Sequence, residues 1–143
     1  MAVLTDILIA PEHDVPAIMA EWPGAKKWLA LETTGLDGLM LTELAEAFDQ
    51  PVLARAIEDL APSAAADEAA GPWVYVLPID FRDRVAGISK PDLGTIAKSW
   101  AEREEASLMG LTPEIAEGLL RDLQNLATEA QAREEPLLLW VSL

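Results

Sequence analysis

The chain ends in an uninterrupted apolar run, Leu137–Val141, that directly follows Pro136. The run has the length of a strand, and the proline terminates the long helical pattern before it. A strand that is apolar on both faces belongs in the middle of a covered sheet, because neither face favours contact with water. We therefore expect the last residues to be part of the core, and we expect deletion of Leu137–Leu143 to abolish folding.

Strand-like and helix-like patterns alternate in the rest of the chain. Three further strands are predicted, over Thr5–Ala10, Lys27–Thr33 and Trp73–Leu77. Helices are predicted over 14–21, 42–48, 49–60, 79–86, 89–100 and 112–135. This order predicts an α+β, or loosely α/β, fold with about four strands in a mixed sheet covered by helices. The long C-terminal helix is followed by the buried terminal strand.

The length of 143 residues matches one domain, so we expect a single compact domain over 1–143. Residues 62–72 are small and polar and lie between two prolines, and we interpret them as an exposed connector. Asp14, Ser89 and Thr112 stand where helix N-caps are expected. In the last helix, an apolar stripe is predicted from Ile115, Ala116, Leu119, Leu120, Leu123, Leu126, Ala127 and Ala130.

The charge is strongly negative: 25 acidic residues against 10 basic ones give a net charge of −15. Such a field repels phosphate, which disfavours binding to nucleic acid or to an anionic membrane, and it attracts a basic protein. Solubility alone is the competing explanation. The sequence contains no cysteine, and its longest apolar run is far below the ~20 residues that cross a bilayer. We expect no signal peptide, because the start of the sequence has no positively charged region. We expect a cytoplasmic location.

No motif for catalysis, metal binding or cofactor binding is present, so we expect no site of these kinds. The chain has one histidine, His13, and Glu12–Asp14 lacks the spacing of a metal site. Ser89 is not in a G-x-S-x-G elbow and is better explained as a helix cap. The turn from Thr34 to Gly38 lacks the pattern of a phosphate-binding loop.

Two surface sites are candidates. Trp22, Lys26, Lys27 and Trp28 combine aromatic and basic side chains around a turn, as interface hot spots do, although both tryptophans also suit a role as core anchors. Trp73, Trp100 and Trp140 fall on apolar elements and are predicted core. Three further bases, Arg82, Arg84 and Lys90, form a possible anion-binding patch. Ordinary surface charge is the alternative there, because Asp80 stands four residues before Arg84.

The C-terminal half, about residues 72–143, carries a resemblance. This half contains, in order, a strand ending in Leu77–Pro78, an I-S-K-P-D-L helix, a long acidic helix and the closing segment P-L-L-L-W-V-S-L. This resembles small uncharacterised bacterial proteins that end in a P-L-x-L-W-x-S-L strand and, more distantly, the YfbM-like family. The resemblance implies a bacterial origin and this architecture. It carries over no functional residue.

Two hypotheses of function remain open. The first is a protein-interaction module that binds a basic partner, as an adaptor, an inhibitor or an immunity-like protein does. The alternative is a small-molecule binder or an enzyme with a pocket near Arg82, Arg84 and Lys90, in which Glu12, His13 or Asp37 acts.

Overall fold

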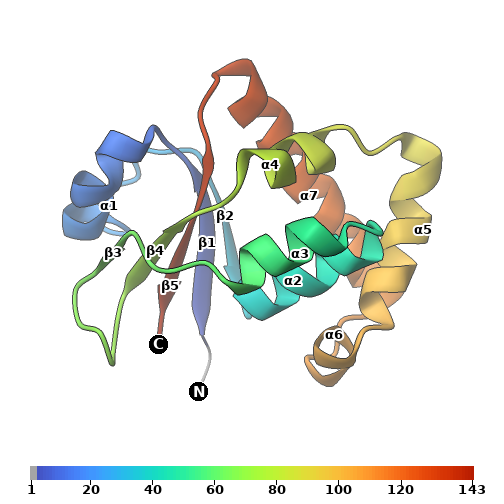
Figure 1. Cartoon of the computed structure of the whole chain (residues 1–143). Coiled ribbons are helices and arrows are strands. Elements are labelled where there is room, and N and C mark those ends of the chain that lie inside the picture. The colour runs from blue at the N-terminus through green and yellow to red at the C-terminus, as the bar shows by residue number, and fades with distance from the viewer. Residues whose placement is uncertain (1–2) are drawn as a thin grey trace.

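Residues 3–143 are described by the computed structural model, in which one antiparallel sheet separates two unequal layers of helix (Figure 1). The sheet has five strands in the order β2-β1-β5-β4-β3. The strands are β1 (Leu4–Ile9), β2 (Ala30–Thr34), β3 (Ala64–Ala65), β4 (Trp73–Val76) and β5 (Leu137–Ser142). The start of β1 and the end of β5 lie side by side at the lower end of the sheet (Figure 1).

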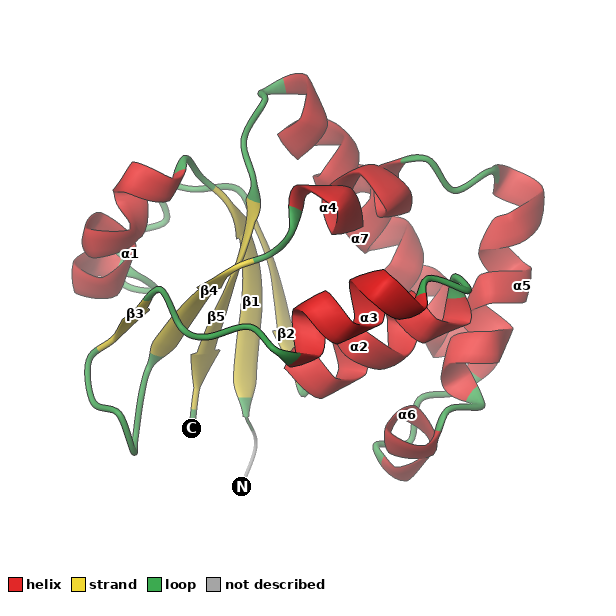
Figure 2. Ribbon diagram, viewed as in Figure 1, coloured by secondary structure: helices red, strands yellow, loops and turns green. Residues whose placement is uncertain are grey.

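The helices are distributed unevenly about the sheet (Figure 2). A short 3-10 turn, Glu12–Asp14, leads into α1 (Val15–Glu21) on one side. The other side carries α2 (Gly38–Ala47), α3 (Pro51–Glu58), α4 (Ile79–Ala86), α5 (Lys90–Ala101), α6 (Glu104–Leu108) and α7 (Pro113–Ala132). Within residues 3–143, none of these helices has the length and apolarity needed to cross a membrane.

The terminal strand β5 occupies the centre of the sheet, as its sequence predicts. It pairs with β1 on one side and with β4 on the other, and residues 137–140 are buried. Its two faces belong to different cores: Leu139 packs with the six-helix layer, and Leu138 and Trp140 pack with α1. Both faces are covered because both are apolar, so the prediction of a covered central strand is confirmed.

The larger core lies between the sheet and α2–α7, and Trp100, Phe81 and Leu120 are fully buried in it. The Trp100 indole donates a hydrogen bond of 3.0 Å to the Met40 carbonyl, which links α5 to α2. The smaller core forms around Ile18 of α1. The two cores differ in size because the six helices α2–α7 supply more apolar surface than α1 does.

The sheet itself corrects the predicted architecture, because it has five strands, all antiparallel, instead of about four in a mixed arrangement. The additional strand, β3, is two alanines inside the mostly exposed segment 62–72, and alanine has no strand preference that a sequence pattern could reveal. The strand order differs from the chain order because β5, the last strand, inserts between β1 and β4, and it runs antiparallel to both. The predicted strand Lys27–Thr33 begins three residues later, at Ala30.

Several helix ends also differ from the predictions. The helix predicted from Thr42 begins at Gly38, where the Asp37 carboxylate caps it by accepting from the Met40 amide at 3.0 Å. Thr112 caps α7 as expected, by accepting from the Ile115 amide. Asp14 and Ser89 occupy N-cap positions but make no capping hydrogen bond.

The last helix buries a narrower stripe than predicted. Ala116, Leu120, Leu123, Ala127 and Ala130 are buried, whereas Ile115 is 58% exposed. The short helix α6 was not predicted at all, because its five residues are too few for a helical period to appear in the sequence.

Candidate functional site

An apolar hollow of about 360 Å³ lies between the sheet and the ends of α2 and α3. Its floor comes from Tyr75 of β4, from Leu77 just after that strand, and from Leu139 and Val141 of β5. The remaining lining residues come from the helix side and the edge of β4: Asp37, Gly38, Leu39, Thr42, Ile57, Glu58, Leu60 and Trp73. This is the size range of a pocket that holds a small ligand or one long side chain.

The alternation of β4 brings two aromatic rings to this hollow. Trp73 and Tyr75 face the six-helix layer, because Val74 between them faces α1 and belongs to the smaller core. Neither the Trp73 indole nor the Tyr75 hydroxyl makes a hydrogen bond within residues 3–143, although both side chains are half-buried. The hollow therefore offers aromatic surface and two uncommitted polar groups. Trp73 was predicted to be core and instead lines an opening.

The polar rim of the hollow is acidic. Asp37 lies at the start of α2 and Glu58 at the end of α3, and in the described part of the chain no basic group lies within 4 Å of either carboxylate. The Thr42 hydroxyl is already used, since it donates to the Gly38 carbonyl at 2.8 Å. Aromatic faces beside unpaired carboxylates favour a cation with an apolar stem, which is the chemistry of a lysine or arginine side chain.

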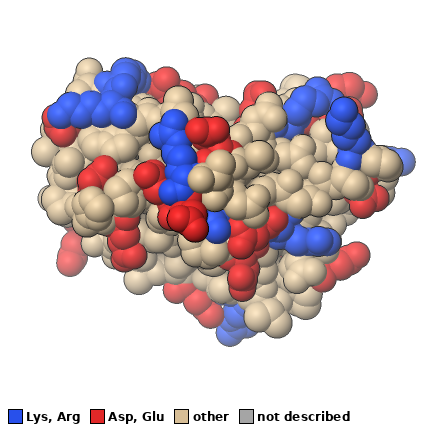
Figure 3. Space-filling model, turned by 90° about the horizontal axis from the view of Figure 1, so that it is seen from above, with Lys and Arg blue, Asp and Glu red and all other residues tan. Residues whose placement is uncertain are grey.

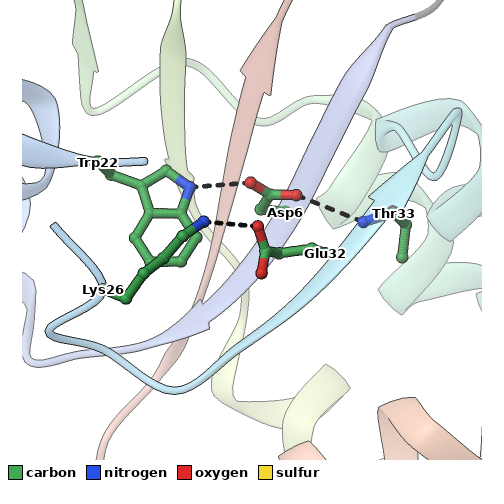
Figure 4. A network of polar contacts seen from close by, with 5 residues as sticks. All are labelled: Asp6, Trp22, Lys26, Glu32 and Thr33. Atoms are coloured by element: carbon green, nitrogen blue, oxygen red, sulfur yellow. Dashed lines mark hydrogen bonds and ion pairs between the residues drawn. The ribbon is translucent and has the colours of Figure 1, made fainter. Parts of the chain in front are cut away.

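The turn that carries the first predicted site is held together internally (Figure 4). The Trp22 ring is only 6% exposed, and its Nε1 donates a hydrogen bond of 2.8 Å to the Asp6 carboxylate. Lys26 Nζ lies 4.4 Å from the centroid of the Trp22 ring and 2.6 Å from Glu32 Oε1. The other oxygen of Asp6 accepts from the Thr33 amide at 3.3 Å.

The remaining two residues of this turn are also engaged. Trp28 is half-buried, meets Trp22 edge-on at 6.5 Å and donates to the Asp14 carboxylate at 3.1 Å. Lys27 pairs with Glu21. The structure thus brings all four residues together, with an internal partner for each. Partner binding at Trp22, Lys26, Lys27 and Trp28 stays a prediction, to which the exposed lysines and the Trp28 edge would contribute most.

The second predicted site does not converge on one point. The Arg82 side chain is 11% exposed, pairs with Asp83 at 2.9 Å and donates to the Glu135 carbonyl at 3.0 Å. Arg84 lies over the Phe48 ring at 5.9 Å and lines a shallow hollow together with Asp80 and Asp83.

Lys90 lies apart from that hollow, exposed at the start of α5. In the view of the molecule from above, basic side chains are interspersed with acidic ones (Figure 3). Anion binding by Arg82, Arg84 and Lys90 stays a prediction, and it rests mainly on the two exposed bases.

The residues named for an alternative enzymatic role are separated. His13 is 83% exposed and lies 3.5 Å from an Asp14 oxygen, and Glu12 lines a different hollow beside α1. In residues 3–143 no group of three histidine or acidic side chains is placed to hold a metal ion. Asp37 alone reaches the apolar hollow.

Sequence reasoning missed most of that hollow. Glu58 appeared to be one of many solvated carboxylates, and Tyr75 to be one residue of a strand. The lining comes from several segments that are distant in sequence, so no local pattern marks it. One sequence signal did point to part of the hollow. The prolines on either side of Trp73–Leu77 indicated the strand that supplies the aromatic wall of the hollow.

No family model matches the chain, and no curated protein matches it. A solved structure that is similar to it is that of YfbM from Escherichia coli, described as a protein of unknown function. The two are 13% identical, with a TM-score of 0.47 over 98% of this chain and 99% of the other. A similarity at this level carries no argument about this chain, so the YfbM-like resemblance inferred from the sequence stays a prediction. The P-L-x-L-W-x-S-L group and the bacterial origin stay predictions.

Proposed function

We propose that the protein is a binding module for a basic protein partner, which places a lysine or arginine side chain in the hollow beside Trp73 and Tyr75. The observation that carries the proposal is the combination, in one hollow, of an apolar floor, two aromatic walls and two carboxylates that have no basic partner within residues 3–143. In this role the protein acts by sequestering its partner, as an adaptor, an inhibitor or an immunity-like protein does.

The distribution of charge supports the same conclusion. Seven of the ten basic residues lie within 4 Å of an acidic side chain: Lys26, Lys27, Arg55, Arg82, Arg103, Arg121 and Arg133. Most of the positive charge is therefore neutralised locally, and the excess of 15 acidic residues sets the field that a partner meets. Such a field accelerates association with a basic protein and makes that association sensitive to salt.

The test begins with a random peptide library displayed on phage and selected at low salt against the immobilised full chain. We expect the selected peptides to be enriched in lysine and arginine. Their affinities are then measured by calorimetry for the wild type and for the double variant Asp37→Asn, Glu58→Gln. Asparagine caps helices as well as aspartate, so this variant keeps the start of α2 and loses only charge.

The matched control is the double variant Glu68→Gln, Glu102→Gln, which removes two exposed carboxylates outside the hollow. We expect the variant in the hollow to weaken binding about tenfold, and the control to weaken it much less. Trp73→Leu should also weaken binding, because it removes an aromatic face. Equal losses of affinity in the two double variants would show that the hollow is not the binding site. Selected peptides without basic residues would overturn the proposed function itself.

A further inference from the structure

The strand β2 forms an open edge of the sheet. Its neighbour on one side is β1, and no strand of the described chain lies on the other side. The amide of Ile9 donates to Leu29 and that of Gly35 donates to Val3, each at 2.9 Å. Hydrogen-bonded pairs alternate along an antiparallel ladder, so the odd-numbered residues of β2 are the ones bonded to β1.

It follows that Ala30, Glu32 and Thr34 direct their backbone N–H and C=O groups away from the sheet. Within residues 3–143 these groups have no other hydrogen-bond partner. The opposite edge is different, because β3 has only two residues and offers little to pair with. Open edges of strand length are templates for a further strand, and proteins normally protect them.

An apolar groove of about 370 Å³ runs beside this edge, on the side of α7. It is lined by Thr33 and Thr34 of β2 and by Met109, Leu111, Ile115 and Leu119 of the α6–α7 region. Two of these apolar side chains, Met109 and Ile115, are 53% and 58% exposed, and the adjacent Leu108 is 76% exposed. Exposed apolar side chains gathered next to unpaired backbone groups indicate a docking surface.

The charges around the edge specify which segment fits. Thr33 faces the groove, whereas Glu32, paired opposite Asp6, faces the side of α1. A strand added beside β2 would therefore place every second side chain against Ile115 and Leu119, and the others beside Glu32. The Glu32 side chain is 57% exposed. In the described part of the chain it is held only by an exposed pair with Lys26, which a competing cation can replace at little cost. Asp122 adds a second carboxylate at the groove.

We propose that β2 accepts an extended segment of a partner protein by strand addition, with apolar side chains in the α7 groove alternating with basic side chains on the Glu32 side. The backbone pairing supplies affinity, and the alternation supplies specificity. A second copy of this chain is a poorer occupant, because each copy carries a net charge of −15 and the two would repel. The site is separate from the hollow beside Trp73 and does not depend on it.

The probe is the synthetic peptide acetyl-Lys-Val-Lys-Val-Lys-Val-Lys-amide, titrated into the full chain while backbone amide signals and their hydrogen exchange are followed by NMR. We expect saturable binding and slower exchange at the amides of Glu32 and Thr34. The same peptide with alternate backbone nitrogens methylated cannot form the ladder and should bind about tenfold more weakly or worse. A peptide with glutamate in place of lysine should not bind.

Ile115→Glu places a charge in the groove at an exposed helix position and should reduce binding of the lysine–valine peptide about tenfold. Val52→Glu, at a residue that is 83% exposed on α3 and outside the groove, is the matched control and should have little effect. Equal binding by Ile115→Glu, or exchange protection outside β2, would overturn the proposal. Protection of the β2 amides that rises with protein concentration in the absence of peptide would assign the edge to a second copy and overturn it as well. The double variant Asp37→Asn, Glu58→Gln should bind this peptide as the wild type does. A failure of strand addition at β2 can therefore be distinguished from a failure of the proposed function.

Discussion

The carboxylate of Asp6 accepts a hydrogen bond of 2.8 Å from the Trp22 indole, which ties the first strand to the end of helix α1. Asp6 is only 6% exposed, and its other hydrogen bond comes from the backbone amide of Thr33. No lysine, arginine or histidine within residues 3–143 forms an ion pair with it. Neutral donors therefore hold a nearly buried carboxylate, and each of them matters because water cannot replace it.

Trp22→Phe should lower the free energy of unfolding by about 1.5–3 kcal/mol, the range for a lost hydrogen bond to a charged group. Urea unfolding followed by circular dichroism measures this value. Trp28→Phe is the matched control, since it also removes an indole donor to a carboxylate, at 3.1 Å to Asp14. The Asp14 side chain is 32% exposed, so water can replace the lost donor and the expected loss is smaller. Equal losses in the two variants would contradict the importance assigned to the burial of Asp6.

Glu43 caps a helix from a distance. Its two carboxylate oxygens accept from the amides of Ala106 at 2.9 Å and Glu105 at 3.1 Å, and its side chain comes from α2. Arg103, the N-cap residue of α6, makes no side-chain capping bond, so Glu43 supplies what the local sequence lacks. Glu43→Ala should cost about 2 kcal/mol in unfolding free energy, because it leaves these amides without their partner.

Faster hydrogen exchange at the Glu105 and Ala106 amides should accompany this loss, since α6 begins there. Glu46→Ala is the control on the same helix: Glu46 makes an exposed ion pair with Arg103 at 3.8 Å. Pairs of that kind contribute about 0–1 kcal/mol, so little change is expected. Unchanged exchange at α6 in Glu43→Ala would show that the helix does not depend on this cap.

Deleting Leu137–Leu143 should eliminate cooperative unfolding, because it removes β5 from between β1 and β4. Leu139→Ala is the milder test. This side chain is 2% exposed, and truncations of this kind cost about 2–5 kcal/mol. Deleting only Leu143, which is 59% exposed, should leave the melting transition nearly unchanged and serves as the control. A protein lacking Leu137–Leu143 that melts like the wild type would disprove the central role of the strand.

The sequence predicts elements well where one residue pattern decides them. The run after Pro136 identified the central strand, and Thr112 followed by proline identified the start of α7. Prediction from the sequence fails where an element depends on a contact with a residue that is distant along the chain. No sequence pattern near α6 indicates that Glu43 caps this helix. Likewise, no pattern near Ala64–Ala65 predicts that these residues pair with β4.

The same limit applies to the candidate sites. Trp22, Lys26, Lys27 and Trp28 are neighbours in sequence and were readily grouped, and the structure does bring them together. The hollow beside Tyr75 joins residues from 37 to 141, and the edge groove joins β2 to α7. Ile115 fits the apolar period of its helix and yet is exposed, because a period records which residues are apolar and not whether another element covers them.

Asp67 gives a pH-dependent prediction. Its pKa is lowered, first by the hydrogen bond from the Ala70 amide at 2.9 Å and then by that from the Ala69 amide at 2.8 Å, because both favour the ionised carboxylate. A pKa that is lower in the folded chain than in the unfolded one means that this turn is stabilised above the unfolded pKa. The stabilisation is lost as the pH falls through the folded pKa.

In NMR titrations, the Asp67 carboxyl carbon and the Ala69 and Ala70 amides should therefore share a midpoint below that of a free peptide of residues 64–70. In Asp67→Asn, which keeps an acceptor and cannot titrate in this range, the two amide signals should lose that transition. A carboxyl midpoint equal to or above that of the peptide would show that the two amides do not hold the ionised form.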